Sequence, residues 1–333
     1  MSRKPLSLAI ADYDRVAALA DGTVRPDGVD LQVRTLAPSE TFYRMLKDDE
    51  FDVSEMSLSS FLIARQLGRD WTAIPVFPFR AGFHVGVYIR EDSGVQTPAD
   101  LAGRRFGMPE YQMTAALWIR GALQHDFGLD LRDVEWCIER TRSLSHGGET
   151  GFSPPPGINI TDLEGATLSE LLVAGELDAV MPSPYPGMAS RLNRTDAAAL
   201  AASPGIRRLF ADPAAEVDRY YQAHGFLHMN HTVVVQSRHV RDDPGLPMRL
   251  HDAFVTAKEE SYAGMDRFRK CNLVHGGLML ERQRLVYGED PFPYGLAANK
   301  HALETLVQYS AEQGLIPSAP QVTDLFHEST LGT

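Results

Sequence analysis

The sequence has few cysteines, no long apolar run and no excess of basic side chains. Only two of its 333 residues are cysteine, Cys137 and Cys271, so no disulfide framework is expected and a reducing compartment fits. No segment approaches the roughly 18–20 apolar residues of a membrane-spanning helix. Acidic residues outnumber basic ones by 44 to 32. The resulting net charge of −12 argues against nucleic acid or a membrane surface as the main partner.

The N-terminus lacks the features of an export signal. Its apolar part, residues 6–11, is brief, contains Ser7 and ends at Asp12. A secretory signal needs roughly 7–15 continuous apolar residues followed by a cleavage site of small residues. We therefore expect this segment to be the first strand of the fold and the protein to be cytoplasmic.

Several motifs that would announce a cofactor, a metal or a nucleophile are also missing. The chain contains no GxGxxG or Walker loop and no GxSxG elbow, and neither cysteine lies in a CxxC pair. His228 and His231 are three residues apart, which on a strand places them on opposite faces, a poor geometry for chelation. We therefore predict neither a cofactor nor a metal site.

Short β-type runs alternate with helical patterns along most of the chain. FDVSEMS, WTAIPVFPF and HVGVYI (84–89) predict strands, and ETFYRMLKDDE and LSSFLIARQLG predict helices. This alternation predicts an α/β protein with largely parallel sheets. A second α/β set begins near residue 105, and HTVVVQ returns as a strand at residue 231.

Two sets of this kind predict two lobes with a ligand cleft between them. We place the first lobe at residues 1–104 and 232–333, and the second at residues 105–231. Lobes connected in this way close around a ligand by a hinge motion. The site is expected at the carboxyl ends of the strands that face the cleft.

Long segments of the chain resemble the 4,5-dihydroxyphthalate decarboxylase family. The resemblance runs nearly end to end, and its most specific segments are FDVSEMSLSSF (51–61) and PEYQMTAALWIRG (109–121). That family is similar to type II periplasmic solute-binding proteins, which implies a two-lobed α/β fold of that type carrying an enzyme. A non-catalytic solute-binding protein or sensor for a small carboxylate is the alternative on the same fold.

The resemblance also implies a reaction and a partner. The expected activity is cofactor-free decarboxylation of a hydroxylated aromatic acid, 4,5-dihydroxyphthalate or a related hydroxybenzoate, by protonation of the ring carbon and loss of CO₂. The partner is then a small aromatic carboxylate, and a homo-oligomer is compatible with the sequence. The turn MPSPYPG (181–187) departs from the family, which tends to carry an arginine there. Because an arginine fork matches a carboxylate, this departure leaves the exact substrate open and makes Tyr185 a candidate contact.

Three side chains are candidates for moving the proton. His84 opens the run HVGVYI and has a titration range that suits transfer near neutral pH. Asp14 follows the first predicted strand, and Glu110 precedes a predicted helix. Each has a structural alternative: a hydrogen-bonded core histidine for His84, a helix cap for Asp14 and a lobe-hinge residue for Glu110.

Other side chains are candidates for binding the substrate. Arg80 is the predicted carboxylate anchor, with a surface or hinge ion pair as its alternative. The hydroxyls of two serines and the free N–H groups beside them suit an anion, and a tyrosine could stack on the aromatic ring. His231 lies at the return crossing, where it could act as a second proton donor. The remaining candidates follow predicted strands or begin predicted helices: Tyr13, Ser57, Ser59, Tyr111, Gln112 and Thr114.

Overall fold

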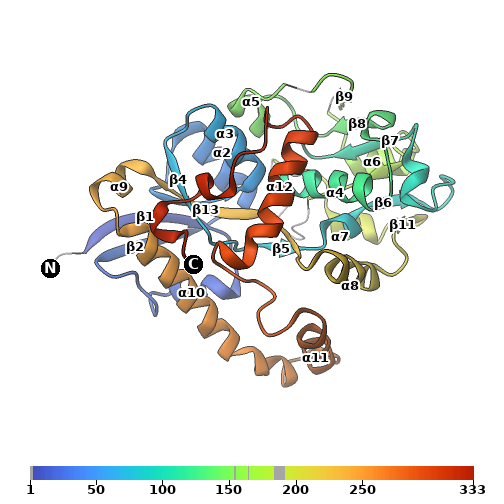
Figure 1. The fold of residues 1–333 in the computed structure, drawn as a ribbon. Coiled ribbons are helices and arrows are strands. Elements are labelled where there is room, and N and C mark those ends of the chain that lie inside the picture. Colours follow the sequence, from blue (N-terminus) through green and yellow to red (C-terminus); the bar gives the residue numbers. More distant parts are fainter. Residues whose placement is uncertain (1–2, 154, 164, 184–191) are drawn as a thin grey trace.

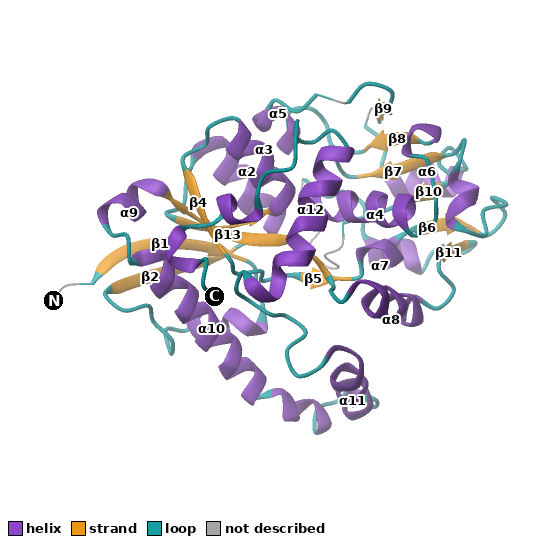
Figure 2. Cartoon of the chain, viewed as in Figure 1, coloured by secondary structure: helices purple, strands orange, loops and turns teal. Residues whose placement is uncertain are grey.

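Two β-sheets with helices packed around them form the body of the protein (Figure 1). The computed structural model describes residues 3–153, 155–163, 165–183 and 192–333. Figure 2 shows that helices lie along both sheets, as in a layered α/β protein. The described helices are α1 (Ala17–Ala20), α2 (Pro38–Asp48), α3 (Leu58–Gln66), α4 (Thr114–His125), α5 (His146–Thr150), α6 (Leu168–Ala174), α7 (Ala197–Ala201), α8 (Pro213–His224), α9 (Ser237–Asp242), α10 (Leu246–Ala263), α11 (Gly276–Tyr287) and α12 (Lys300–Glu312). Within the described ranges, none of them is both long and apolar enough to cross a membrane.

The first sheet has five strands in the order β2-β1-β3-β13-β4. They are β1 (Lys4–Ile10), β2 (Val29–Thr35), β3 (Val53–Ser57), β4 (Trp71–Ile74) and β13 (His231–Gln236). β1, β2 and β3 are parallel, and β13 runs antiparallel to β3 and β4. Every residue of β3 and β13 is buried, as expected for central strands covered on both faces.

The second sheet has six strands in the order β11-β6-β10-β7-β8-β9. They are β6 (Tyr88–Arg90), β7 (Arg105–Met108), β8 (Glu135–Ile138), β9 (Asn159–Asp162), β10 (Ala179–Val180) and β11 (Ile206–Arg208). β6 pairs with β10 and β11, although it precedes the predicted boundary at residue 104. The lobe boundaries stay a prediction, and the membership of β6 favours a first crossing before residue 88.

A two-stranded ribbon lies at the crossing between the sheets. β5 (Arg80–Ala81) pairs antiparallel with β12 (His228–Met229). The sequence predicted a strand from His84, but the chain forms a 3₁₀ helix there, η2 (Phe83–Gly86), and β6 begins only at Tyr88. The Phe83 N–H donates to His228 Nδ1 at 3.2 Å, so a contact with the returning chain takes the place of strand pairing.

The C-terminal helix ties the second lobe to the rest of the chain. α12 lies against α4, and the ring of Tyr309 covers Gly121 so closely that a Cβ there would lie 2.1 Å from it. Arg120 donates to the side chain of Gln313 at 2.8 Å. A single apolar cluster therefore runs through α3, α4 and α12 and joins the two lobes.

Candidate functional site

A small cavity lies between the two sheets at the ends of several strands. Its wall includes the carboxyl end of β3, the start of β13 and residues from the segments that follow β7 and β8. This is the place where α/β folds bind ligands. Its volume is about 20 Å³. The residues that line it come from both lobes: Ser39, Phe42, Ser57, Met113, Thr114, Arg140, His146, Asn193, Asn230 and His231. We call it the polar cavity.

Arg140 is the buried cation of the polar cavity. Its Nη1 donates to Glu110 Oε2 at 2.5 Å, and its Nη2 donates to Asn193 Oδ1 at 2.7 Å. Glu110 also accepts from the Ser145 hydroxyl and from the Gly147 N–H. Burial alone would raise the pKa of Glu110, but interaction with His146, the ion pair with Arg140 and these two donors outweigh burial and hold the pKa below its usual value. Glu110 is therefore a carboxylate that fixes Arg140.

His146 is a neutral imidazole beside this ion pair. Burial and then the charge of Arg140 lower the pKa of His146 to about 4. Its Nδ1 lies 3.5 Å from Arg140 Nη1, and its Nε2 lies 3.2 Å from the backbone oxygen of Ser39. Since the arginine can only donate, Nδ1 accepts and Nε2 carries the proton. The Nε2–H group therefore donates to the backbone oxygen of Ser39, which lies in the other lobe.

His231 lies on the opposite wall, on β13. It stands across from Ser57 in the β3–β13 pairing and diagonal to Glu55, so all three side chains share one face of the sheet. His231 Nδ1 is 2.5 Å from Glu55 Oε1, and Asn230 Nδ2 is 2.9 Å from His231 Nε2. The ring packs edge-on against Phe42, with 4.7 Å between the ring centroids.

Glu55 is fully buried and held by several donors. Besides His231, the Tyr13 hydroxyl donates to Oε1 at 2.7 Å, and the Ala11 N–H donates to Oε2 at 2.9 Å. Its exposed fraction is 0%. The predicted site residue Tyr13 thus contacts Glu55, the hydrogen-bond partner of His231, and does not line the polar cavity.

A hydroxyl cluster joins the lobes at the floor of the cavity. The Oγ atom of Ser57 lies 2.8 Å from Thr114 Oγ1, and both residues line the polar cavity. The Ser59 N–H donates to Thr114 Oγ1 at 3.0 Å, and the Ser59 hydroxyl donates to the backbone oxygen of Gln112. Ser59 therefore supports Thr114 from behind and does not line the cavity.

Gln112 and Tyr111 lie next to the polar cavity and line a separate hollow. Gln112 Oε1 accepts from the Thr150 hydroxyl at 2.9 Å, and its buried amide nitrogen finds no hydrogen-bond partner in the described part of the chain. The ring of Tyr111 stacks on Phe152, and the guanidinium of Arg120 lies 3.7 Å from its centroid. Both faces of Tyr111 are therefore occupied by protein.

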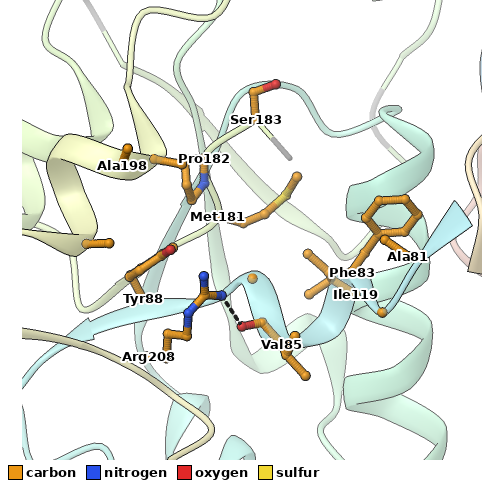
Figure 3. Close-up of a pocket in the computed structure, with 14 residues that line it drawn as sticks. Ala81, Phe83, Val85, Tyr88, Ile119, Met181, Pro182, Ser183, Ala198 and Arg208 are labelled. Carbon is orange, nitrogen blue, oxygen red and sulfur yellow. Dashed lines mark hydrogen bonds between the residues drawn. The ribbon is translucent and has the colours of Figure 1, made fainter. Parts of the chain in front are cut away.

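A larger cavity of about 410 Å³ adjoins the polar one. A hydrogen bond from Asn193 Nδ2 to Ser183 Oγ, at 3.2 Å, connects the linings of the two cavities. Most of its labelled residues in Figure 3 are apolar. Among those drawn, the polar side chains are Tyr88, Ser183 and Arg208, and Arg208 donates to the backbone oxygen of Val85 at 3.0 Å. We call it the apolar cavity. Its volume falls within the range of small-molecule sites.

The comparison with known proteins decides the family. No family model matches the chain. A 4,5-dihydroxyphthalate decarboxylase of Comamonas testosteroni is 32% identical over 335 residues, which cover 99% of this chain and 98% of that relative. The chain belongs to the 4,5-dihydroxyphthalate decarboxylase family. A second protein of this name, from Pseudomonas putida, is 35% identical over 225 residues, 67% of this chain and 83% of the relative. The family is one of carboxy-lyases, as the resemblance implied.

Solved structures show the fold. The periplasmic aliphatic sulphonate binding protein SsuA from Escherichia coli matches the whole chain with a TM-score of 0.56 at 14% identity, with 100% of both chains covered. The desulfurization enzyme DSZB matches with a TM-score of 0.52 at 17% identity, covering 99% of this chain and 98% of that one. The predicted two-lobed fold of type II periplasmic solute-binding proteins is confirmed.

Of the residues predicted from the sequence, the structure brings Ser57, Thr114 and His231 to the polar cavity. His84 lines neither cavity. It is buried in η2 with Nε2 at 3.1 Å from Glu216 Oε1 and its ring centroid 5.0 Å from that of Tyr220. That environment is the structural alternative named for it.

Asp14 and Arg80 also lie outside the polar cavity. Asp14 is half-exposed and accepts from Arg15 Nη1 at 3.1 Å. Arg80 is buried and donates to the backbone oxygen of Pro293 at 2.8 Å and to Asn299 Oδ1, which ties it to the C-terminal segment. Burial lowers the pKa of Arg80 to about 10. Tyr185 lies outside the described residues.

Sequence reasoning missed Arg140, His146, Asn193 and Asn230, and it did not place Glu55 in the site. Arg140 lies two residues after the end of β8 (Glu135–Ile138), so the strand-end argument used for other candidates would have found it. His146 begins the short helix α5, Asn193 lies in an irregular segment, and neither residue stands in a periodic pattern. Within the described residues, no group of three or more His, Cys, Asp or Glu side chains is arranged to hold a metal ion.

Proposed function

We propose that the protein decarboxylates a hydroxylated aromatic carboxylic acid, 4,5-dihydroxyphthalate or a related hydroxybenzoate, without a cofactor. The observation that carries this proposal is the polar cavity, where a buried arginine and an imidazole held by a carboxylate face each other from the two lobes. Membership of the decarboxylase family supports the reaction type. Cytoplasmic action and a homo-oligomer stay predictions; both cysteines carry free thiols, which a reducing compartment maintains.

The substrate carboxylate is expected to bind at Arg140. A guanidinium matches a carboxylate with two parallel N–H donors. Asn193 holds one of its nitrogens at 2.7 Å, so a bound carboxylate would take over this contact. The hydroxyls of Ser57 and Thr114 are neutral donors at the floor of the cavity. Glu110 already balances the charge of Arg140. We therefore expect the site to hold one substrate carboxylate through hydrogen bonds, rather than through the combined charge of several cations.

The aromatic ring is expected to extend from the polar cavity into the apolar one. The polar cavity, at about 20 Å³, has room for little more than a water-sized group, whereas the apolar cavity has about 410 Å³. The hydrogen bond between Asn193 and Ser183 lies between them, so substrate entry must displace it. A hinge motion at the β5–β12 ribbon is expected to open the polar cavity, which residues of both lobes line.

His231 is the proton donor in this proposal. Its Nε2 proton moves to the ring carbon that bears the carboxylate, while a ring hydroxyl supplies electron density. The carbon–carbon bond then breaks, its electron pair returns to the ring, CO₂ leaves, and solvent reprotonates the imidazole. The role predicted for His84 stays a prediction, and its buried position in η2, outside both cavities, favours His231 as the proton donor.

A CO₂-release assay on purified, metal-stripped protein tests the function. 4,5-Dihydroxyphthalate is compared with hydroxybenzoates that carry one carboxylate, and the products are identified. CO₂ release from the diacid or from a mono-acid, lost in His231→Gln, would support the proposal and define the substrate. Tight binding by calorimetry with no CO₂ from any of them would favour the solute-binding alternative.

A further inference from the structure

We infer that Glu55 is a positioning residue that fixes the tautomer and the orientation of His231 for proton transfer, and that Tyr13 assists it. This inference rests on the proposed function, because it assumes that His231 delivers the proton. The proposed substrate contacts do not include the buried carboxylate of Glu55. Glu55 is fully buried and lines neither cavity, yet it contacts an imidazole that lines the polar one.

The hydrogen bonds of Glu55 determine which ring nitrogen of His231 carries the proton. The Ala11 N–H donates to Oε2, and the Tyr13 hydroxyl donates to Oε1. A carboxylate accepts only, so the 2.5 Å contact with His231 places the imidazole proton on Nδ1. The other ring nitrogen, Nε2, accepts from the Asn230 amide at 2.9 Å in this tautomer. It is the atom that would take up and deliver the catalytic proton once the Asn230 contact opens.

The strand pairing makes this arrangement rigid. Glu55 and His231 lie on adjacent central strands, β3 and β13, and both strands are buried along their whole length. The His231 ring is also packed against Phe42 at 4.7 Å and Phe79 at 5.8 Å between centroids. In the proposed step, the carboxylate of Glu55 would stabilise the positive charge of His231 once its second ring nitrogen has taken up the proton, as in other carboxylate–histidine pairs.

The variant Glu55→Gln tests the inference because, of the Ala11 N–H and the His231 imidazole, only the imidazole can change from donor to acceptor. The Ala11 N–H is a backbone donor and cannot be reversed, so the amide oxygen of the glutamine is expected to turn toward it. The amide N–H₂ then faces His231 Nδ1 and forces the proton onto Nε2. We expect kcat to fall about 10²- to 10⁴-fold with KM little changed, and ¹⁵N-histidine NMR to show the switch from the Nδ1–H to the Nε2–H tautomer.

Two further variants separate positioning from folding. Tyr13→Phe removes one donor to Glu55 and leaves the carboxylate in place, so kcat is expected to fall only about fivefold with the tautomer unchanged. Glu216→Gln removes the carboxylate that contacts another buried histidine, His84. As the matched control it should lower stability and leave both kcat and the His231 signals unchanged.

The outcomes are distinguishable. The inference would be overturned if the NMR spectrum of the wild-type protein showed the Nε2–H tautomer of His231, or if Glu55→Gln kept the wild-type kcat. The tautomer measurement uses the wild-type protein, so it tests the inference even if Glu55→Gln does not fold. An equal loss of kcat in Glu216→Gln would also overturn it. A tautomer switch in Glu55→Gln with no CO₂ release by the wild type would refute the proposed function and leave the orientation of His231 by Glu55 standing.

Discussion

Arg140 serves the site and the stability of the fold at once, because its charge is balanced by a buried carboxylate. Its Nη1 lies 2.5 Å from Glu110 Oε2, and both side chains are almost completely buried. Removing one member of such a pair leaves an uncompensated buried charge, which costs about 3–5 kcal/mol. We therefore expect Arg140→Met to abolish turnover and to lower the free energy of unfolding by about that amount.

The double variant Arg140→Met/Glu110→Gln is the control. It removes both charges, so urea unfolding should show most of the lost stability recovered, while the CO₂ assay should show no activity. If the double variant were as unstable as Arg140→Met, the cost would lie in packing and not in the unpaired Glu110.

Two buried carboxylate–histidine pairs in this protein should respond differently to mutation. His231→Gln is expected to lower kcat about 10²- to 10⁴-fold, because it removes the proposed proton donor. His84→Gln should leave kcat within error and lower stability by about 1–3 kcal/mol, because it breaks the buried contact with Glu216. Turnover and thermal unfolding of the two variants are measured side by side. A large loss of kcat in His84→Gln would restore the role predicted for it from the sequence.

At the residue scale, the sequence located the site only where a strand end marks it. Ser57 and His231 were found because they stand at the ends of clear strands, and Thr114 because it begins a helix. Asn193 and His146 were missed because their place depends on how an irregular segment and the short helix α5 pack across the cleft. The prediction of Arg80 as the carboxylate anchor failed to foresee its contacts for a related reason. Nothing in its local sequence shows that Pro293 and Asn299 accept hydrogen bonds from its guanidinium.

At the scale of elements, the contact between α4 and α12 depends on one glycine. A Cβ at Gly121 would lie 2.1 Å from the ring of Tyr309, which itself is buried. We expect Gly121→Ala to be destabilising by about 1–3 kcal/mol, since the ring must move or the helices must separate. Thermal unfolding checks this. Gly86→Ala, where nothing lies within 4 Å of the added Cβ, is the control and should change stability much less.

Elements with a strong local pattern were predicted well, and those decided by distant contacts were not. The helix following Tyr111 and the strand at 231–236 are present as α4 and β13. The run HVGVYI alternates like a strand, yet its first half forms η2 because Phe83 and His84 contact the returning chain and α8. Local alternation carries no information about such partners.

At the scale of the whole molecule, two lobes followed from the repeated α/β pattern, but the membership of β6 did not. β6 joins the second sheet through pairing with β10 and β11, strands that lie about ninety or more residues later in the chain. Pairing over such separations depends on how the sheets assemble. The family resemblance, which covers nearly the whole chain, was therefore the stronger guide to the fold.

The stability of the whole molecule should fall as the pH is lowered from about 6.5 to about 4. Burial and Arg140 lower the pKa of His146 to about 4, and burial lowers the pKa of His228 well below its usual value. In this window the unfolded chain protonates both imidazoles and the folded chain keeps them neutral, so the unfolded state binds more protons and the free energy of unfolding rises with pH. For His146 alone the shift corresponds to about 3 kcal/mol. Urea unfolding across this range measures the slope. His146→Gln should flatten it in part, and a wild-type curve without slope would show that these imidazoles are protonated in the folded state as well.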